Sequence, residues 1–187
     1  MIRLVAATAL LFLVACGSEP PTRFEAASEP TPERVRIAYK AVSIRDVSLP
    51  TYAATEEISS ADLDGRLSSS GSALWADDPV RAITLDVARA LREVSGARVA
   101  PDPWPYQSRP EATVDIRFEE LIPDANGEYR AAGLYFVAPD DEDRVEHAHE
   151  FAFSIQYDVE AGFAALAAAR AQLANMLVLD IAQTALR

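Results

Sequence analysis

Two histidines on one expected strand are the first residues whose types and spacing suggest chemistry. His147 and His149 are the only histidines in the chain and stand two residues apart, so an extended segment would place both on the same face. A zinc site needs three or four converging ligands, whereas Glu146 and Glu150 would point to the opposite face. The pattern does not predict a metal site, and we expect the two histidines at a partly solvated sheet edge.

The other candidates for catalysis or metal binding are weaker. The acidic segment PDDED at 139–143 lacks the spaced carboxylates and central glycine of an EF-hand loop, and it is typical of a solvated hairpin turn. The serines at 68–72 do not form the G-x-S-x-G pattern of a nucleophile elbow, and the sequence has no glycine-rich phosphate loop. We therefore expect no catalytic residues, no metal, no cofactor and no enzymatic activity.

The position of Cys16, the only cysteine in the chain, indicates covalent modification rather than a disulfide. It follows the apolar run Leu4–Val14, which has the length of a secretory signal core and is shorter than the roughly 20 residues that a spanning helix needs. The ending Leu13, Val14, Ala15, Cys16 resembles the lipobox of bacterial lipoproteins. That resemblance implies cleavage between Ala15 and Cys16 and two or three acyl chains on Cys16.

The charge of the chain excludes nucleic acid as a partner. The formal net charge is -12 at pH 7 and the isoelectric point is near 4.6, so the protein repels phosphate backbones and anionic headgroups alike. A polybasic patch therefore cannot hold it on a membrane. Two or more acyl chains anchor a protein stably without help from charge, and we assign the anchoring to them.

Composition divides the chain into three parts. Residues 1–15 are expected to be a lipoprotein signal peptide, 16–33 the lipidated cysteine and a flexible tether, and 34–187 one domain. The segment at 17–33 contains four prolines and no apolar periodicity, as is typical of a linker. Fully extended it would reach on the order of 50 Å at about 3.5 Å per residue, so we expect the domain to stand clear of its membrane.

The first half of the domain is expected to contain strands and one well-defined helix. Asp78 is placed to cap that helix, Pro79 to begin it and Gly96 to follow its end. The other expected segments are a bulged strand at 35–47, two brief strands or a hairpin at 56–67, a loop at 68–72, a short strand at 98–100 and an irregular loop at 102–110.

The second half is expected to form an antiparallel meander and a closing helix. Alternating apolar residues begin at 112, 128 and 144, with turns at Asn126-Gly127 and at the acidic segment. The alanine-rich segment 162–186 follows, with Phe163, Leu166, Leu173, Leu177 and Ile181 on its buried side. The fold class is α/β (α+β), a single domain with a mixed, mostly antiparallel sheet and two main helices packed on one face.

Trp75 lies immediately before the expected helix, in the segment LWADDP at 74–79. One interpretation is a hydrophobic contact that packs the start of the helix onto the sheet. The other is a contact with a neighbouring subunit or partner, because aromatic residues are enriched at interfaces.

The order of these segments resembles the PqiC-type ABC transport auxiliary lipoproteins, the lipoprotein subunits of membrane-integrity-associated transporters. The similarity extends over about 35–186 and rests on the lipobox and tether, VSLPTY at 47–52, LWADDP at 74–79, the meander that begins VDIRFEEL at 114–121, and the closing helix. The loop at 102–109, with Trp104 and Tyr106, departs from the family pattern.

The resemblance implies a non-enzymatic component of an Mce/Pqi-type ABC lipid transport system, which contributes to phospholipid transport between inner and outer membranes and to envelope integrity. The implied partners are an Mce-domain periplasmic protein, its inner-membrane permease and ATPase complex, and further copies of the same chain. By analogy of position, the interface residues would be Leu49, Pro50, Tyr52, Leu74 and Trp75.

The resemblance also implies a location on the outer membrane, facing the periplasm. Gly17 is not the aspartate that marks inner-membrane retention in many lipoproteins, which agrees with the outer membrane, while the inner membrane stays an alternative. The main alternative function is a lipoprotein scaffold or assembly factor for another envelope complex.

Overall fold

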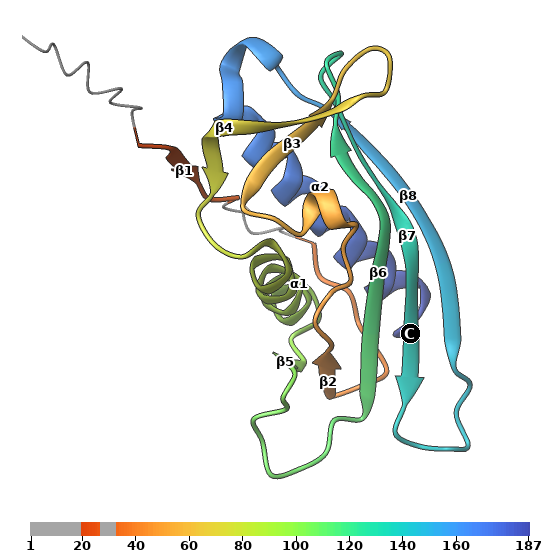
Figure 1. Ribbon diagram of the computed structural model, residues 1–187. Coiled ribbons are helices and arrows are strands. Elements are labelled where there is room, and N and C mark those ends of the chain that lie inside the picture. The colour runs from red at the N-terminus through yellow and green to blue at the C-terminus, as the bar shows by residue number, and fades with distance from the viewer. Residues whose placement is uncertain (1–19, 27–32) are drawn as a thin grey trace, which may run out of the picture.

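Five strands form the larger of two sheets, in the order β5-β2-β6-β7-β8 (Figure 1). The computed structural model describes residues 20–26 and 33–187, so the predictions for Ala15 and Cys16 lie outside the described residues. Strand β2 pairs in parallel with β5 and β6, and β6, β7 and β8 pair antiparallel, which confirms the mixed sheet. The strands are β2 (Ala41–Ile44), β5 (Arg98–Pro101), β6 (Ala112–Pro123), β7 (Glu128–Pro139) and β8 (His147–Gln156).

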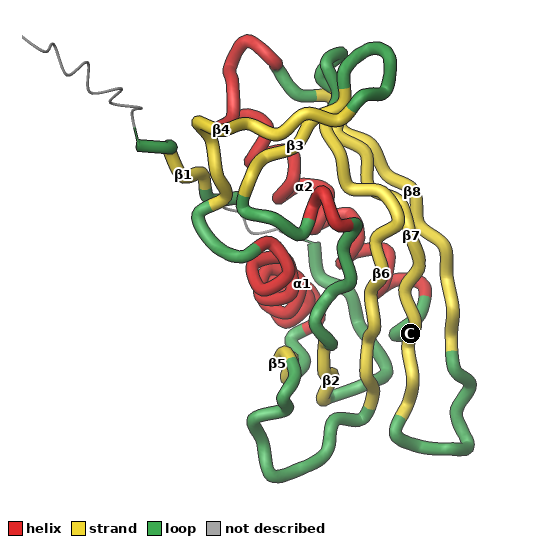
Figure 2. Tube along the Cα trace, viewed as in Figure 1, coloured by secondary structure: helices red, strands yellow, loops and turns green. Residues whose placement is uncertain are grey.

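Two long helices cover one face of this sheet, as predicted (Figure 2). Helix α1 (Pro79–Ser95) packs on β2 and β5, and α2 (Gly162–Thr184) packs on β7, β8 and α1. The Asp78 carboxylate accepts a hydrogen bond from the Arg81 N–H at 2.8 Å, and Gly96 ends α1 in the left-handed conformation with φ of 70°. The predicted caps of α1 are therefore confirmed.

Helix α2 is a core helix of the domain. The segment Val159–Thr184 is long and apolar enough to cross a membrane by composition, with a mean hydropathy of 1.4. Within the domain, however, its predicted stripe faces the sheet: Phe163 is half-buried, and Leu166, Leu173, Leu177 and Ile181 are buried. The 3-10 turn η2 (Val159–Ala161) leads from β8 into α2.

The smaller sheet has the order β1-β4-β3, and it contains the serine segment that was predicted to be a loop. Strands β3 (Glu57–Ala61) and β4 (Leu67–Trp75) form a hairpin, so the prediction of a hairpin at 56–67 is correct for its first strand and its turn, whereas the loop at 68–72 is wrong. Cross-strand pairing, with Ser59 Oγ 3.0 Å from Ser69 Oγ, stabilises an extended chain that lacks the alternating pattern of a strand. A 3-10 turn, η1 (Thr51–Ala53), precedes β3.

Strand β1 (Thr22–Phe24) corrects the prediction of a flexible tether throughout 16–33. It pairs in parallel with β4, placing Thr22 opposite Ala73 and Phe24 opposite Trp75. The Phe24 ring lies 5.4 Å from the Phe163 ring of α2, and the Arg23 guanidinium donates to the Trp75 carbonyl at 3.0 Å. A strand of three residues with one aromatic side chain is too short for periodicity to reveal.

The strand predicted at 35–47 is also shorter than expected, because β2 covers Ala41–Ile44 alone. Val35 and Tyr39 are buried, but the backbone before β2 pairs with helix ends instead of a strand. The Val35 N–H donates to the Val94 carbonyl at the end of α1, and the Ala38 N–H donates to the Leu186 carbonyl.

The loop at 102–110 is irregular, as predicted, and folds on itself rather than over the core. The Trp104 and Tyr106 rings lie 5.0 Å apart, and Tyr106 is exposed. At the same end of the molecule Val145 is 72% exposed, because it precedes β8 by two residues.

Gly133 of β7 lies opposite Phe118, where a bulge interrupts the pairing of β6 and β7. A Cβ atom at position 133 would collide with the Arg117 carbonyl oxygen and would lie 2.9 Å from Phe118 Cα. The bulge brings the two backbones close together, and only glycine fits there.

We therefore predict that Gly133→Ala lowers the free energy of unfolding by about 1–3 kcal/mol, the usual cost of overpacking. Gly71→Ala in β4 is the matched control, because a Cβ there meets nothing within 4 Å. Urea unfolding of both variants measures the difference, and equal midpoints would contradict the prediction.

Candidate functional site

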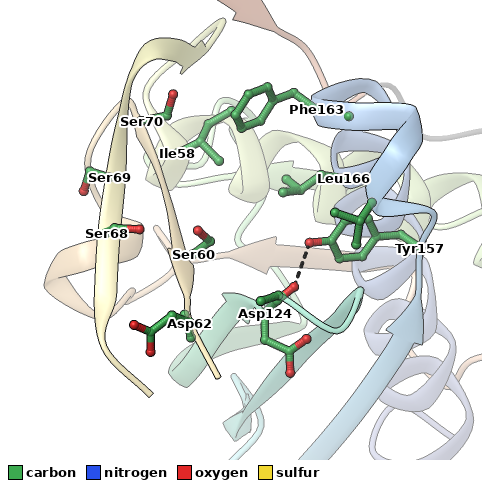
Figure 3. Close-up of a pocket in the computed structure, with 14 residues that line it drawn as sticks. Ile58, Ser60, Asp62, Ser68, Ser69, Ser70, Asp124, Tyr157, Phe163 and Leu166 are labelled. Carbon is green, nitrogen blue, oxygen red and sulfur yellow. Dashed lines mark hydrogen bonds between the residues drawn. The ribbon is translucent and has the colours of Figure 1, made fainter. Parts of the chain in front are cut away.

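A pocket of about 400 Å³ lies between the β3–β4 hairpin, the β6–β7 turn and the start of α2 (Figure 3). Its volume is within the range of about 300–1,000 Å³ that is usual for small-molecule sites. The lining residues are Ile58, Ser60, Ala61, Asp62, Ser68, Ser69, Ser70, Asp124, Ala125, Tyr157, Val159, Gly162, Phe163 and Leu166.

The inner wall of the pocket is apolar. Ile58 of β3 and Leu166 of α2 are almost fully buried, and Figure 3 shows them, together with Phe163, pointing into the space between the strands and the helix. The Tyr157 ring closes the side next to the β6–β7 turn. Such a wall favours hydrocarbon over a charged group, because removing apolar surface from water makes the free energy of binding more favourable.

The rim of the pocket carries hydroxyl groups from β3 and β4. Ser69 is paired with Ser59, whereas the hydroxyls of Ser60 and Ser68 have no hydrogen-bond partner within the described part of the chain. Each hydroxyl can donate one hydrogen bond and accept two. The rim can therefore bind ester or hydroxyl oxygens of a ligand whose chain lies against the apolar wall.

The carboxylate of Asp124 closes the β6–β7 turn and is already satisfied. It accepts from the N–H groups of Asn126 at 2.9 Å and Glu128 at 3.1 Å, and from the Arg130 guanidinium at 2.8 Å. Desolvation would raise the pKa of Asp124, but these hydrogen bonds and the charge of Arg130 outweigh it and lower the pKa below 3.8. The Asp124 carbonyl accepts from the Tyr157 hydroxyl at 3.1 Å.

The pocket therefore suits binding better than catalysis. No lining residue is a lysine, arginine, histidine or cysteine, so a serine in it has no base to activate it. The carboxylates of Asp62 and Asp124 are engaged by the backbone N–H groups of their own turns. An uncharged or apolar ligand group matches this lining.

Trp75, the aromatic residue singled out from the sequence, is 5% exposed and packs in the core. Its ring lies 3.6 Å below the guanidinium carbon of Arg170 in α2, a cation–π contact between the small sheet and the helix. Burial lowers the pKa of Arg170, although the charge of Asp86 opposes the effect. The structure thus favours the packing interpretation of Trp75 over a direct partner contact.

Arg170 also lines a second pocket, of about 380 Å³, between the end of β1 and α1. Glu25, Asp77 and Asp86 line that pocket together with Arg170. Asp77 and Asp86 also pair with Arg81 and Arg89 of α1. With carboxylates around the cation, this second pocket is not an anion site.

The remaining interface candidates are half-buried and surround η1 and β4. Leu49 packs against the core, and the Tyr52 hydroxyl accepts from the Leu121 N–H at 3.4 Å. Tyr52 and Trp75 line the same small cavity. Leu74 faces the other side of the small sheet from Trp75, because successive side chains of a strand alternate, so the five residues do not form one patch.

The two histidines occupy the predicted position at a sheet edge, half-buried on strand β8. Their rings lie 5.9 Å apart, and the His149 ring stacks on Tyr135 at 5.4 Å. Within residues 20–26 and 33–187, no three His, Cys, Asp or Glu side chains are placed to hold a metal ion.

Sequence reasoning missed Arg170 and the serine-lined pocket. Arg170 stands four residues after Leu166 and three before Leu173, so a charged residue within the apolar stripe of the last helix was a signal of a buried contact. The pocket gave no such signal, because it joins segments that lie far apart in the sequence.

Comparison with known proteins connects these features with a family. The family model described as the ABC-type transport auxiliary lipoprotein component matches residues 24–182, and no curated protein matches the sequence. The match begins at Phe24 in β1 and ends within α2, so it includes both sheets and both helices.

Solved structures share the fold at low sequence identity. An uncharacterised protein has a TM-score of 0.70 at 16% identity, covering 88% of this chain and 98% of its own. A Xanthomonas campestris protein of the family DUF330 has a TM-score of 0.65 at 19% identity, covering 85% of this chain and 90% of its own. At these identities the likeness concerns the fold alone.

We predict that Trp75→Ala lowers the free energy of unfolding by about 3–5 kcal/mol, because it leaves a large cavity and removes the ring beneath Arg170. Trp75→Phe keeps an aromatic face there and costs less. Leu74→Ala, a half-buried neighbour, is the control. Urea unfolding measures all three, and a Trp75→Ala variant as stable as Leu74→Ala would contradict the prediction.

A second prediction concerns acid unfolding. Since the pKa of Asp124 is lower in the folded state than in the unfolded chain, its stabilising contribution is complete above pH 3.8 and is lost as the pH falls through the folded value. Asp124→Asn should therefore flatten the decline of unfolding free energy as the pH falls below about 4. Parallel pH profiles for the two proteins would show that Asp124 makes no such contribution.

Proposed function

Because the chain belongs to the family of ABC-type transport auxiliary lipoprotein components, we propose that it is a non-enzymatic subunit of an Mce/Pqi-type lipid transport system. The match over residues 24–182 is the single observation that carries the proposal. The described domain is compatible with it, because the pocket between the β3–β4 hairpin and α2 contains an apolar wall and no catalytic pair.

In this proposal the protein is fixed to the outer membrane and faces the periplasm. The segment LVAC at 13–16 supports cleavage before Cys16 and acylation of its sulfur. The net charge of -12 supports anchoring by acyl chains rather than by attraction to anionic headgroups.

The proposed partners are an Mce-domain protein, the permease and ATPase complex that it serves, and further copies of this chain. The proposed contact residues are Leu49, Pro50 and Tyr52 around η1 and, on the other side of the small sheet from Trp75, Leu74, since each is partly exposed. Trp75 would act indirectly, by packing β4 against α2.

Labelling with palmitate tests the anchor. We expect the full chain to incorporate palmitate and to fractionate with membranes, and Cys16→Ser to lose both properties because it removes the acylated sulfur. A wild-type protein that is secreted as a free, unlabelled species would contradict the proposed anchor.

Copurification tests the partner. With the protein extracted in mild detergent, we expect an Mce-domain protein to copurify, and Leu74→Glu to weaken this because it places a charge in the proposed contact. Leu85→Glu is the matched control, since Leu85 is 39% exposed on α1 and outside the proposed contact. Copurification of a different envelope complex from wild-type protein would favour the scaffold alternative.

A further inference from the structure

Strand β1 fixes where the N-terminal segment enters the domain. Thr22 lies opposite Ala73 of β4, and the Phe24 ring contacts Phe163. Phe163 is itself a wall of the serine-lined pocket. The chain that leads back to Cys16 therefore leaves the domain beside this pocket.

The distance from this point to the proposed anchor is short. Six positions separate Cys16 from Thr22, and at about 3.5 Å per residue they span at most about 21 Å. A tether that was free as far as residue 33 would reach more than twice as far. This step rests on the proposed acylation of Cys16, and it shortens the expected reach of the tether.

The end of the molecule that carries the pocket also exposes apolar side chains. The β3–β4 hairpin, the β6–β7 turn and η2 gather at this end (Figure 1). Leu63 and Leu67 of the hairpin are 76% and 51% exposed, and Val159 of η2 is 47% exposed. Apolar side chains around an apolar pocket, close to a lipid anchor, match a membrane surface.

The charged residues at this end of the domain favour some lipid headgroups over others. The turns at this end carry Asp62, Asp64, Asp124, Asp158 and Glu160, with Arg66 as the cation of the hairpin turn. An acidic end repels anionic headgroups, whereas a zwitterionic headgroup presents its ammonium group to the carboxylates.

We propose that the pocket between the β3–β4 hairpin and α2 binds one acyl chain of a zwitterionic phospholipid from the membrane that anchors the protein. The chain lies along Ile58, Phe163 and Leu166. The hydroxyls of Ser60 and Ser68, which have no partner in the described residues, donate to the ester oxygens of the lipid.

Photocrosslinking of the full chain in cells tests this proposal. Benzoylphenylalanine replaces Ser68 at the pocket, and in a second strain it replaces Val145, which is also exposed and lies at the opposite end. Cells are labelled with radioactive phosphate and irradiated. We expect the protein with the probe at 68 to carry a phosphate label that phospholipase C releases, and the protein with the probe at 145 to stay unlabelled.

A second part of the experiment fills the pocket with a larger side chain. Ser60→Phe, combined with the probe at 68, should abolish the labelled adduct, whereas Ser72→Phe on the exposed part of β4 should leave it unchanged. Circular dichroism and protease resistance establish that both variants fold. A Ser60→Phe variant that fails to fold is replaced by Ser60→Leu, with the same expectation.

Three outcomes would overturn the proposal. They are equal labelling at positions 68 and 145, no phosphate label at 68, and an adduct at 68 that carries palmitate without phosphate, since the last would be the acyl chain of Cys16 itself. Palmitate labelling of Cys16 in the same cells then shows whether the pocket assignment alone is wrong or the proposed anchor is wrong as well. With Cys16 acylated, only the pocket assignment fails, and with Cys16 unmodified the proposed anchor fails as well.

Discussion

The burial of helix α2 between two sheets is the constraint on which the rest of the structure depends. Its alanine-rich faces let β7, β8 and α1 approach closely, while Arg170 reaches Trp75 of the small sheet and Phe163 reaches Phe24 of β1. Without α2, the small sheet would be joined to the larger one mainly where β3 meets the β6–β7 turn, through the hydrogen bond from the Ala125 N–H to the Ala61 carbonyl. Because α2 contacts both sheets, the pocket has a fixed apolar wall and the N-terminal segment has a fixed exit.

These contacts connect the fold with its family function. An auxiliary lipoprotein must be held at a membrane while it presents a surface to a transport complex. If Cys16 is acylated as proposed, the parallel pairing of β1 with β4 leaves a short segment between the anchor and Thr22, which would orient the domain as well as retain it. In the proposed orientation the pocket end faces the membrane, and the loop at 102–110 and the acidic turn at 139–143 face away from it.

Much of this fold could be predicted from the sequence, because strong local signals specify its larger elements. Asp78, Pro79 and Gly96 mark the ends of α1, and alternating apolar residues mark the meander. The errors occurred where tertiary contacts outweigh local pattern. The serines of β4 become part of a strand through pairing with β3, and β1 becomes a strand through its pairing with β4 and the contact of Phe24 with Phe163. The pocket itself depends on side chains from β3, β4, the β6–β7 turn and α2, whose meeting no local pattern encodes.

The proposed orientation of the domain on its membrane can be measured by energy transfer from the protein to lipid headgroups. The acylated protein is reconstituted into bilayers that contain an acceptor-labelled lipid, with a donor dye on Leu67→Cys or on Val145→Cys. We predict strong transfer from position 67 and weak transfer from position 145. Equal transfer from the two positions, or stronger transfer from 145, would contradict this prediction.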